Sequence, residues 1–179
     1  ALLQSLGFPM QSISTALESF APVPGRMEQF PMPNGSTAIV DYAHNPDGLQ
    51  HLLEAARHLC PESLHVVFGC GGDRDRGKRP IMGALAAKLA DFCWITSDNP
   101  RTEDPEAIIQ DIREGIPAQT DRMHFETDRE AAIRQAYAAT GKGDLLIIAG
   151  KGHEDYQIVG QERLSFSDQA VLRALQTGA

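Results

Sequence analysis

Four consecutive residues near the middle of the chain, Asp98-Asn99-Pro100-Arg101, combine side chains that could recognise a small charged ligand. They follow the apolar run from Phe92 to Ile95, which is typical of a buried strand in a parallel sheet. Pro100 cannot donate to a strand ladder, so it ends the strand and keeps Asn99 extended. Asn offers a donor and an acceptor, and Arg offers a rigid fork for a carboxylate or phosphate. Open parallel sheets bind ligands beyond the carboxyl ends of their strands, which predicts a ligand here; the alternative is a polar turn before a helix.

A second candidate is the glycine-rich segment from Gly72 to Arg79, Gly-Asp-Arg-Asp-Arg-Gly-Lys-Arg. It nearly matches a phosphate-binding loop, but Arg79 stands where the Ser or Thr that holds Mg²⁺ belongs. A dinucleotide fingerprint beginning at Gly69 also fails, because Arg74 occupies the third glycine position. The segment still places four cations at the start of a helix, namely Arg74, Arg76, Lys78 and Arg79. This arrangement favours anion binding over a merely solvated face.

Two further polar segments follow predicted strands. In Gly150-Lys-Gly-His-Glu154 the glycines would let a ligand approach the backbone, Glu154 could accept from a ligand ammonium, and Lys151 could bind an anion. The alternative for this segment is a tight turn with exposed charges. His44, next to Asn45, could stack on a base or simply cap the following helix.

These segments must be positioned by strands and helices that alternate along the chain. Asn34-Gly35 predicts a hairpin between residues 26–33 and 36–42, and residues 157–164 suggest a second, small hairpin. Buried strands are expected at 65–69, 92–95, 123–125 and 144–149. Helices are expected after Asn45 or Asp47, after Asp104, after a Thr127–Glu130 capping box, and after Ser167. A further helix is expected to begin at Pro80, and its inward residues would be Ile81, Ala84, Leu85 and Leu89. The alternation predicts an α/β, Rossmann-like, mostly parallel doubly wound sheet with an N-terminal hairpin. Its polar strand ends would meet at one edge.

Composition narrows the function classes. With 179 residues, 42% hydrophobic content and a formal net charge of −8, the chain can form one ordinary domain with a core. The acidic balance argues against nucleic acid or an anionic membrane as a partner. Neither the cysteines nor the histidines show metal-binding spacing, so no metal site is predicted and Cys60, Cys70 and Cys93 are interpreted as reduced core thiols.

The first 25 residues do not continue the alternation of strands and helices seen in the rest of the chain. Residues 1–20 contain two short helical patterns broken by Gly7 and Pro9, and residues 21–25 have the composition of a stiff linker. We therefore expect residues 1–21 to be the remnant of a preceding domain, and residues 22–179 to form a complete one.

Five segments taken together resemble the C-terminal domain of the Mur ligases, and in particular of the diaminopimelate-adding, or MurE, type. They are Pro24–Glu28, Asp41–Asp47, Gly72–Pro80, Asp98–Arg101 and Gly150–Glu154, in order and at family-like spacing. The resemblance implies a cytoplasmic step of peptidoglycan synthesis. There, ATP would phosphorylate the D-glutamate γ-carboxylate of UDP-MurNAc-L-Ala-D-Glu, and the amine of meso-diaminopimelate would attack the acyl phosphate.

The resemblance also implies roles for individual residues. The nucleotide would be faced by Arg26, Asp41, His44 and Asn45, and meso-diaminopimelate would be held by Arg74, Asp98, Asn99, Arg101, Gly150 and Glu154. No residue of this chain would be catalytic. The Mg²⁺ that accompanies ATP would bind in the central domain, so this chain is not expected to be active alone. Its partners would be these substrates and the N-terminal and central domains of the same enzyme.

Other interpretations remain open at this stage. Within the same superfamily, the chain could belong to a lysine-adding Mur ligase or a folylpolyglutamate synthase. Family members that use lysine differ in the Asp-Asn-Pro-Arg segment, so Arg101 indicates diaminopimelate. A different class would be a Rossmann-like binding module without catalysis.

Overall fold

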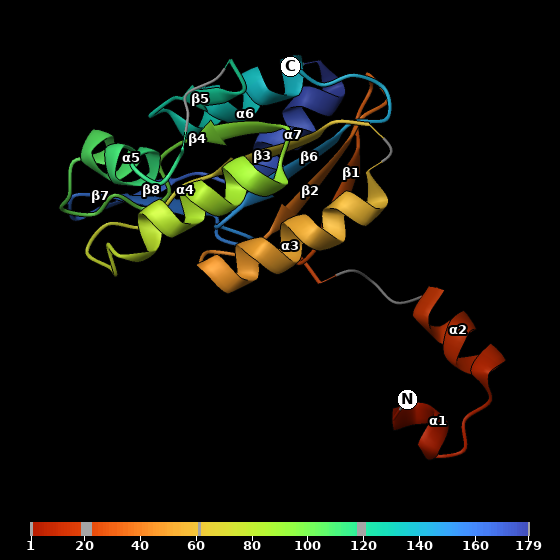
Figure 1. Ribbon diagram of the computed structural model, residues 1–179. Coiled ribbons are helices and arrows are strands. Elements are labelled where there is room, and N and C mark those ends of the chain that lie inside the picture. Colours follow the sequence, from red (N-terminus) through yellow and green to blue (C-terminus); the bar gives the residue numbers. More distant parts are fainter. Residues whose placement is uncertain (1, 19–22, 61, 118–120, 179) are drawn as a thin grey trace.

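A six-stranded sheet lies at the centre of the computed structural model, which describes residues 2–18, 23–60, 62–117 and 121–178 (Figure 1). In spatial order the strands are β1 (Glu28–Pro31), β2 (Thr37–Asp41), β6 (Leu145–Ala149), β3 (Leu64–Phe68), β4 (Phe92–Ile95) and β5 (Met123–Phe125). Only β1 is antiparallel to its neighbour, and the other pairs are parallel. The predicted Rossmann-like sheet with an N-terminal hairpin is therefore confirmed.

The turn of that hairpin is built by Asn34, Gly35 and Ser36. The Asn34 Oδ1 atom accepts hydrogen bonds from the backbone N–H of Ser36 at 3.1 Å and from its hydroxyl at 2.7 Å. Gly35 has a φ of 87°, a left-handed conformation that a side chain would strain. These local bonds fix the register that pairs β1 with β2.

Helices cover both faces of the sheet (Figure 1). One face packs against α3 (Pro46–Leu59), α4 (Lys78–Leu89) and α5 (Pro105–Arg113), and the other against α6 (Arg129–Ala138) and α7 (Asp168–Thr177). The chain runs outward from β2 through β3 and β4 to β5, then returns through α6 to β6 at the centre. Because crossovers are right-handed, this reversal of direction moves the helix to the opposite face.

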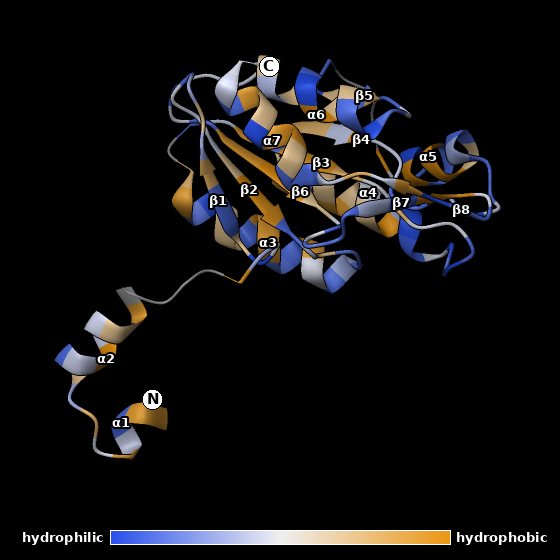
Figure 2. Ribbon diagram, turned by 180° about the vertical axis from the view of Figure 1, so that it is seen from behind, coloured by the Kyte–Doolittle hydropathy of each residue, from blue (hydrophilic) through white to orange (hydrophobic). Residues whose placement is uncertain are grey.

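The strands alternate their side chains between two hydrophobic clusters. In β6, Leu145, Ile147 and Ala149 join the cluster on the α3–α5 face, whereas Leu146 and Ile148 join the one on the α6–α7 face. Figure 2 shows this apolar centre, with hydrophilic residues on the outer helix surfaces. A continuous apolar run is what a strand buried on both faces requires.

Two predicted helix details were wrong. Helix α4 begins at Lys78, and its buried residues are Arg79, Met82, Gly83 and Ala86. Of the residues predicted to face inward, Ile81 is 52% exposed, whereas Leu89 is partly buried against the core. The face is shifted because acidic partners allow Arg79 to be buried, and because Gly83 lies so close to the Ile112 carbonyl of α5 that a Cβ would collide with it. Helix α6 is capped by Asp128, which accepts a hydrogen bond from the N–H of Ala131, and a Thr127 capping box is absent from this described segment.

The predicted helical patterns before the linker are confirmed as α1 (Leu2–Ser5) and α2 (Met10–Glu18), which lie apart from the sheet (Figure 1). Their apolar side chains are exposed, for example Leu2 at 75% and Leu17 at 66%. The expectations for residues 19–22 fall outside the described residues. The predicted second hairpin is confirmed as β7 (Tyr156–Val159) and β8 (Glu162–Ser165). None of the helices described is both long and apolar enough to cross a bilayer.

Candidate ligand-binding site

A cavity of about 340 Å³ lies at the carboxyl ends of β2, β3, β4 and β6. Its lining contains three basic and three acidic side chains beside neutral polar ones. The lining residues are Tyr42, His44, Asn45, Gly71, Arg74, Asp75, Lys78, Asp98, Asn99, Arg101, Gly150 and Glu154. This mixture suits a ligand that carries both ammonium and carboxylate groups.

The structure brings most of the predicted site residues together here. All six residues predicted to hold the amino acid line the cavity, and so do His44 and Asn45. Arg26 and Asp41 are not among the lining residues. The Asp41 carboxylate accepts hydrogen bonds from the backbone N–H groups of Met27 and Ala43, both at 2.9 Å, so it shapes the loop that carries His44.

The buried part of the cavity is a hydrogen-bonded network around Lys151, which is 0% exposed. The Lys151 ammonium donates to the Tyr156 carbonyl at 2.7 Å, to Asn99 Oδ1 at 3.0 Å and to Glu154 Oε2 at 3.5 Å. Asp98 Oδ1 lies 3.3 Å from the same ammonium. The prediction that Lys151 binds an anion was therefore wrong, because its charge is used inside the protein.

Asn99 connects this network in three directions. Its Oδ1 atom accepts from Lys151 and from the N–H of Ile158 at 2.9 Å, and its Nδ2 atom donates to Glu154 Oε2 at 3.0 Å. The site is therefore formed before a ligand arrives, which lowers the entropic cost of binding.

The glycines on either side of Lys151 make this geometry possible. Gly150 and Gly152 have φ values of 120° and 54°, which few other residues adopt. A Cβ on Gly152 would lie 2.7 Å from the Tyr42 Cβ, and one on Gly150 would lie 3.2 Å from Asp98 Oδ2. The glycines thus let the segment pack closely against its neighbours.

Arg101 is held in an unusual backbone conformation, with a φ of 52°. Its N–H donates to the Ile158 carbonyl at 3.0 Å, and its carbonyl accepts from Gly160 at 2.7 Å, so the β7–β8 hairpin stabilises it. Its Nη1 atom donates to the Gly72 carbonyl at 2.8 Å. Among the described residues Nε and Nη2 have no acceptor, which leaves one edge of the fork for a carboxylate. Strained non-glycine residues of this kind cluster at ligand sites.

The four cations predicted to bind an anion at the start of α4 divide into two kinds. Arg79 is buried and pairs with Glu103 and Asp111, both at 2.8 Å, and Arg76 also pairs with Asp111, at 2.9 Å. Hydrogen bonding from Arg79 lowers the pKa of Glu103 to about 2. Arg74 and Lys78 line the cavity, so only these two of the four face a ligand.

A buried ion pair stabilises the strand ends that lead into the cavity. Arg129 and Asp168, both 0% exposed, are joined by two hydrogen bonds of 2.8 Å. Arg129 also donates to the carbonyls of Ser97 and Ala149, at 3.3 and 3.2 Å. These residues immediately precede Asp98 and Gly150, so the pair fixes the two strand ends that enter the cavity.

Tyr42, Gly71 and Asp75 line the cavity although none of them was predicted individually to bind a ligand. Tyr42 contacts His44 edge-on, with ring centroids 4.8 Å apart, and the guanidinium of Arg26 lies 4.6 Å from its ring centroid. Its signal in the sequence was its position between Asp41 and His44 in a strand-end loop.

The described residues contain no group of three or more His, Cys, Asp or Glu side chains placed to hold a metal ion. Cys70 and Cys93 are buried and free, and burial raises the pKa of each thiol to about 12. Both thiols therefore stay protonated, as expected of core cysteines.

A doubly wound sheet whose strand ends form a zwitterionic pocket defines a ligand-binding α/β domain. The chain belongs to the family of the Mur ligase, glutamate ligase domain, whose model matches residues 25–152. It is 53% identical over 175 residues to the UDP-N-acetylmuramoyl-L-alanyl-D-glutamate--2,6-diaminopimelate ligase of Thermosynechococcus vestitus, covering 97% of this chain and 35% of that protein. The Geobacillus kaustophilus ligase of the same name is 47% identical over 168 residues, covering 94% and 34%.

Comparison with solved structures gives the same family assignment. A structure of a ligase of this name superposes with a TM-score of 0.82 at 40% identity, covering 98% of this chain and 36% of that one. UDP-N-acetylmuramate-alanine ligase from Thermotoga maritima, at 20% identity and a TM-score of 0.63 over 97% of this chain and 34% of that one, shares the fold. The chain thus spans about a third of the length of its relatives.

Proposed function

We propose that this chain is the amino-acid-recognising part of an ATP-dependent ligase that adds meso-diaminopimelate to UDP-MurNAc-L-Ala-D-Glu. The observation that carries the proposal is the preformed pocket, where one free edge of Arg101 and the carboxylates of Asp98 and Glu154 face the same cavity. Diaminopimelate has ammonium and carboxylate groups at both ends, and it differs from lysine by one carboxylate. Relatives about 50% identical to this chain carry the name of this activity.

In this proposal Arg101 binds the carboxylate at the end distant from the reacting amine, and Glu154 accepts from the adjacent ammonium. Asn99 holds Glu154 in place through its amide. The other amino group, in its neutral form, then attacks the carbonyl carbon of an acyl phosphate. A C–N bond forms, the C–O bond to phosphate breaks, phosphate leaves, and the nitrogen loses a proton to solvent. Such an attack needs positioning and charge neutralisation, and it needs no nucleophile from the protein.

We assign to His44 and Asn45, with Arg26 and Asp41 behind them, the side of the pocket that meets the nucleotide. The described residues offer no cluster that fits Mg²⁺, so the ion that accompanies ATP is assigned to the central domain of the enzyme. Residues 1–21 are assigned to the end of that domain, and residues 22–179 to the C-terminal one. With ATP and a UDP-linked dipeptide as substrates, the proposed reaction would take place in the cytoplasm.

The test is substrate profiling of the full-length protein that contains this chain. Ligation should require ATP and the UDP-linked dipeptide, and kcat/KM should be far higher for diaminopimelate than for lysine or glutamate. A preference for lysine would support a lysine-adding ligase, and glutamylation of a folate would support a folylpolyglutamate synthase. Either result would overturn the proposal.

A companion experiment uses this chain alone. The isolated chain should unfold cooperatively but release no phosphate from ATP above a blank, because position 79 lacks the hydroxyl of a phosphate-binding loop. Mg²⁺-dependent ATP hydrolysis by the purified chain would contradict the assignment of ATP chemistry to another domain.

A further inference from the structure

The buried ammonium of Lys151 needs an explanation, because a buried ion pair is weak evidence for stability. Lys151 is 0% exposed and contacts Asp98, Asn99 and Glu154, the polar residues of one end of the pocket. Desolvating such a charge is costly, and apolar side chains of similar volume often stabilise a protein equally well. A role in arranging the pocket accounts for the charge better than a role in the fold does.

Lys151 and the backbone N–H of Ile158 together fix the orientation of the Asn99 amide. Asn99 Oδ1 lies against two donors, the Lys151 ammonium at 3.0 Å and the Ile158 N–H at 2.9 Å. If the amide turned over, its NH₂ group would oppose both donors, and Glu154 would face an oxygen. The observed orientation is therefore strongly favoured, and it directs Nδ2 to Glu154 Oε2 at 3.0 Å.

As a consequence, one carboxylate oxygen of Glu154 is bonded within the protein, and the other can accept a hydrogen bond from a ligand. Oε2 accepts from Asn99 and Lys151, whereas Oε1 accepts from no described residue. Nearby, Asp98 Oδ1 is buried, accepts no hydrogen bond from a described residue, and lies 3.3 Å from the Lys151 ammonium. One ammonium and two carboxylates leave a single net negative charge, which one ligand ammonium would neutralise.

We propose that Lys151 is a positioning residue that acts through Asn99 and Glu154 to form the socket for the ligand ammonium. This role rests on the proposed function, since the ligand it serves is the incoming diamino acid. It does not require Lys151 to touch the ligand.

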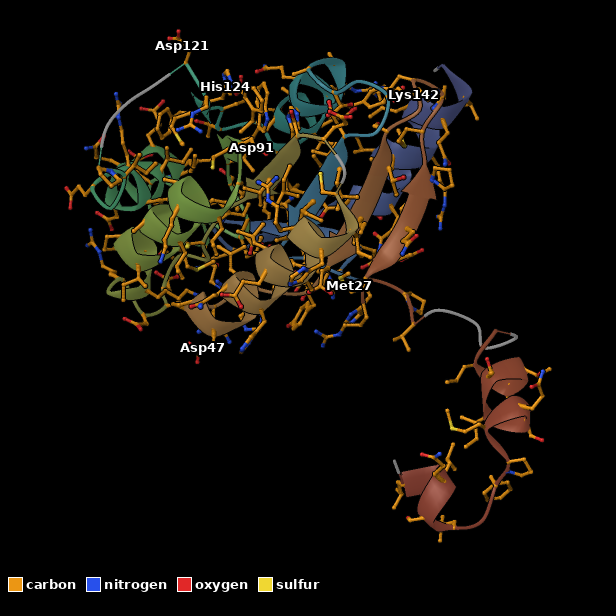
Figure 3. All side chains as sticks on the ribbon, turned by 45° about the vertical axis from the view of Figure 1, so that its right-hand side comes forward. Met27, Asp47, Asp91, Asp121, His124 and Lys142 are labelled. Carbon is orange, nitrogen blue, oxygen red and sulfur yellow. The ribbon has the colours of Figure 1, made fainter. Side chains whose placement is uncertain are left out.

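The experiment uses the full-length ligase and compares Lys151→Met with Lys142→Met. Lys142 is exposed and lies at the end of the domain opposite Met27 and Asp47 (Figure 3). Lys151→Met should raise KM for diaminopimelate by about tenfold or more while KM for ATP changes less than about twofold, and Lys142→Met should change neither. Equal increases in both KM values would overturn the proposal.

A double-mutant cycle with Asn99→Ala separates positioning from general destabilisation. If Lys151 acts through Asn99, Lys151→Met should raise KM for diaminopimelate by less than about threefold once Asn99 is already alanine. Fully multiplicative effects would overturn the proposal. If Lys151→Met is insoluble, Lys151→Gln, which keeps a donor for the Tyr156 carbonyl, is measured by the same criteria. Insolubility of both variants would also overturn it, because Lys151 would then serve the fold. A wild-type enzyme that does not use diaminopimelate would instead reject the proposed function.

Discussion

The floor of the pocket (Asp98, Asn99, Lys151 and Glu154) is buried or nearly so and bonded to itself, whereas the rim (His44, Asn45, Arg74 and Asp75) is exposed. Both regions consist of polar residues that follow strands of the same sheet. The floor side chains have lost their freedom before a ligand arrives, so their contacts are preorganised. The rim side chains are solvated and bond only to nearby residues of their own segments, so most of their polar surface can still meet a ligand or another part of the protein. This difference shows that the number of charged residues around a pocket is a poor guide to ligand binding. A better guide is whether each charged group is already bonded to another group of the protein.

The largest expected effect is a loss of stability when the buried Arg129–Asp168 ion pair is broken. Asp168→Ala would leave the guanidinium of Arg129 buried without its carboxylate, which should lower the free energy of unfolding by about 3–5 kcal/mol. Denaturant unfolding of wild type and variant measures this change. The matched control is Arg129→Met with Asp168→Leu, which removes both charges and should cost much less. A loss below about 1 kcal/mol in Asp168→Ala would show that the pair does not support the floor.

Arg101 joins floor and rim, and its substitution should affect recognition more than stability. Arg101→Ala in the full-length enzyme should cost about 2–5 kcal/mol in kcat/KM for diaminopimelate, because a ligand carboxylate would lose its charged, partly buried partner. Arg101→Lys should not restore activity, since a point charge cannot reproduce the bidentate fork. Activity with lysine should change much less. If Arg101→Ala lowers kcat/KM equally for both amino acids, Arg101 supports the fold or a closed state and does not read the substrate.

The order of elements and the edge that carries the site could be predicted from the sequence. Apolar runs such as residues 144–149, caps such as Asn45 and Ser167, and the Asn34-Gly35 turn act locally, so each can be recognised in its own segment. Because parallel strands end at one edge, the polar segments after them had to meet there.

The pairing of individual charges could not be predicted. Arg74 and Arg79 are five residues apart in the same glycine-rich segment, yet Arg74 lines the pocket. Arg79 is buried in α4 against Glu103, which lies 24 residues further along the chain. Lys151 was expected to face an anion, but its ammonium donates to the Oδ1 atom of Asn99, which is 52 positions away in the chain. Such contacts depend on the packing of whole elements, and a local pattern carries no information about them.

The rim should respond differently from Arg101. Arg74 is exposed, and its guanidinium donates only a long 3.3 Å bond, to the neighbouring Asp73 carbonyl, among the described residues. Arg74→Ala should therefore cost about 1 kcal/mol or less in kcat/KM for diaminopimelate, and added salt should reduce the difference from wild type. Steady-state rates at low and high ionic strength test this. A loss as large as that of Arg101→Ala, insensitive to salt, would place Arg74 with the floor.

The smallest expected effect comes from His65 in β3, a buried histidine that is 1% exposed and stacks on Phe92 with ring centroids 4.6 Å apart. Neither ring nitrogen makes a hydrogen bond to a described residue, and Nε2 lies 3.8 Å from the Asp144 carboxylate. Burial lowers the pKa of His65 below its ordinary value of 6.5, although Asp144 and Asp91 act to raise it.

The direction of the pH effect follows from this shift. As pH falls through about 6.5, the unfolded chain binds a proton at His65 before the folded chain does, so the free energy of unfolding decreases. Above that pH both states are neutral at His65, and its contribution to stability is fully present. Glu103 does not contribute to the change in stability near pH 6.5, because its pKa of about 2 lies far below this range.

His65→Phe should therefore flatten the dependence of stability on pH between about 7.5 and 5.5, since the variant has no proton to gain there. Denaturant midpoints of wild type and His65→Phe across this range measure the difference. His124→Gln is the matched control, because burial also lowers the pKa of His124, but that ring is only partly buried and stacks on Trp94. It should flatten the curve less. Parallel curves for wild type and His65→Phe would mean that His65 is protonated equally in both states, and that burial of this histidine carries no pH penalty in this sheet.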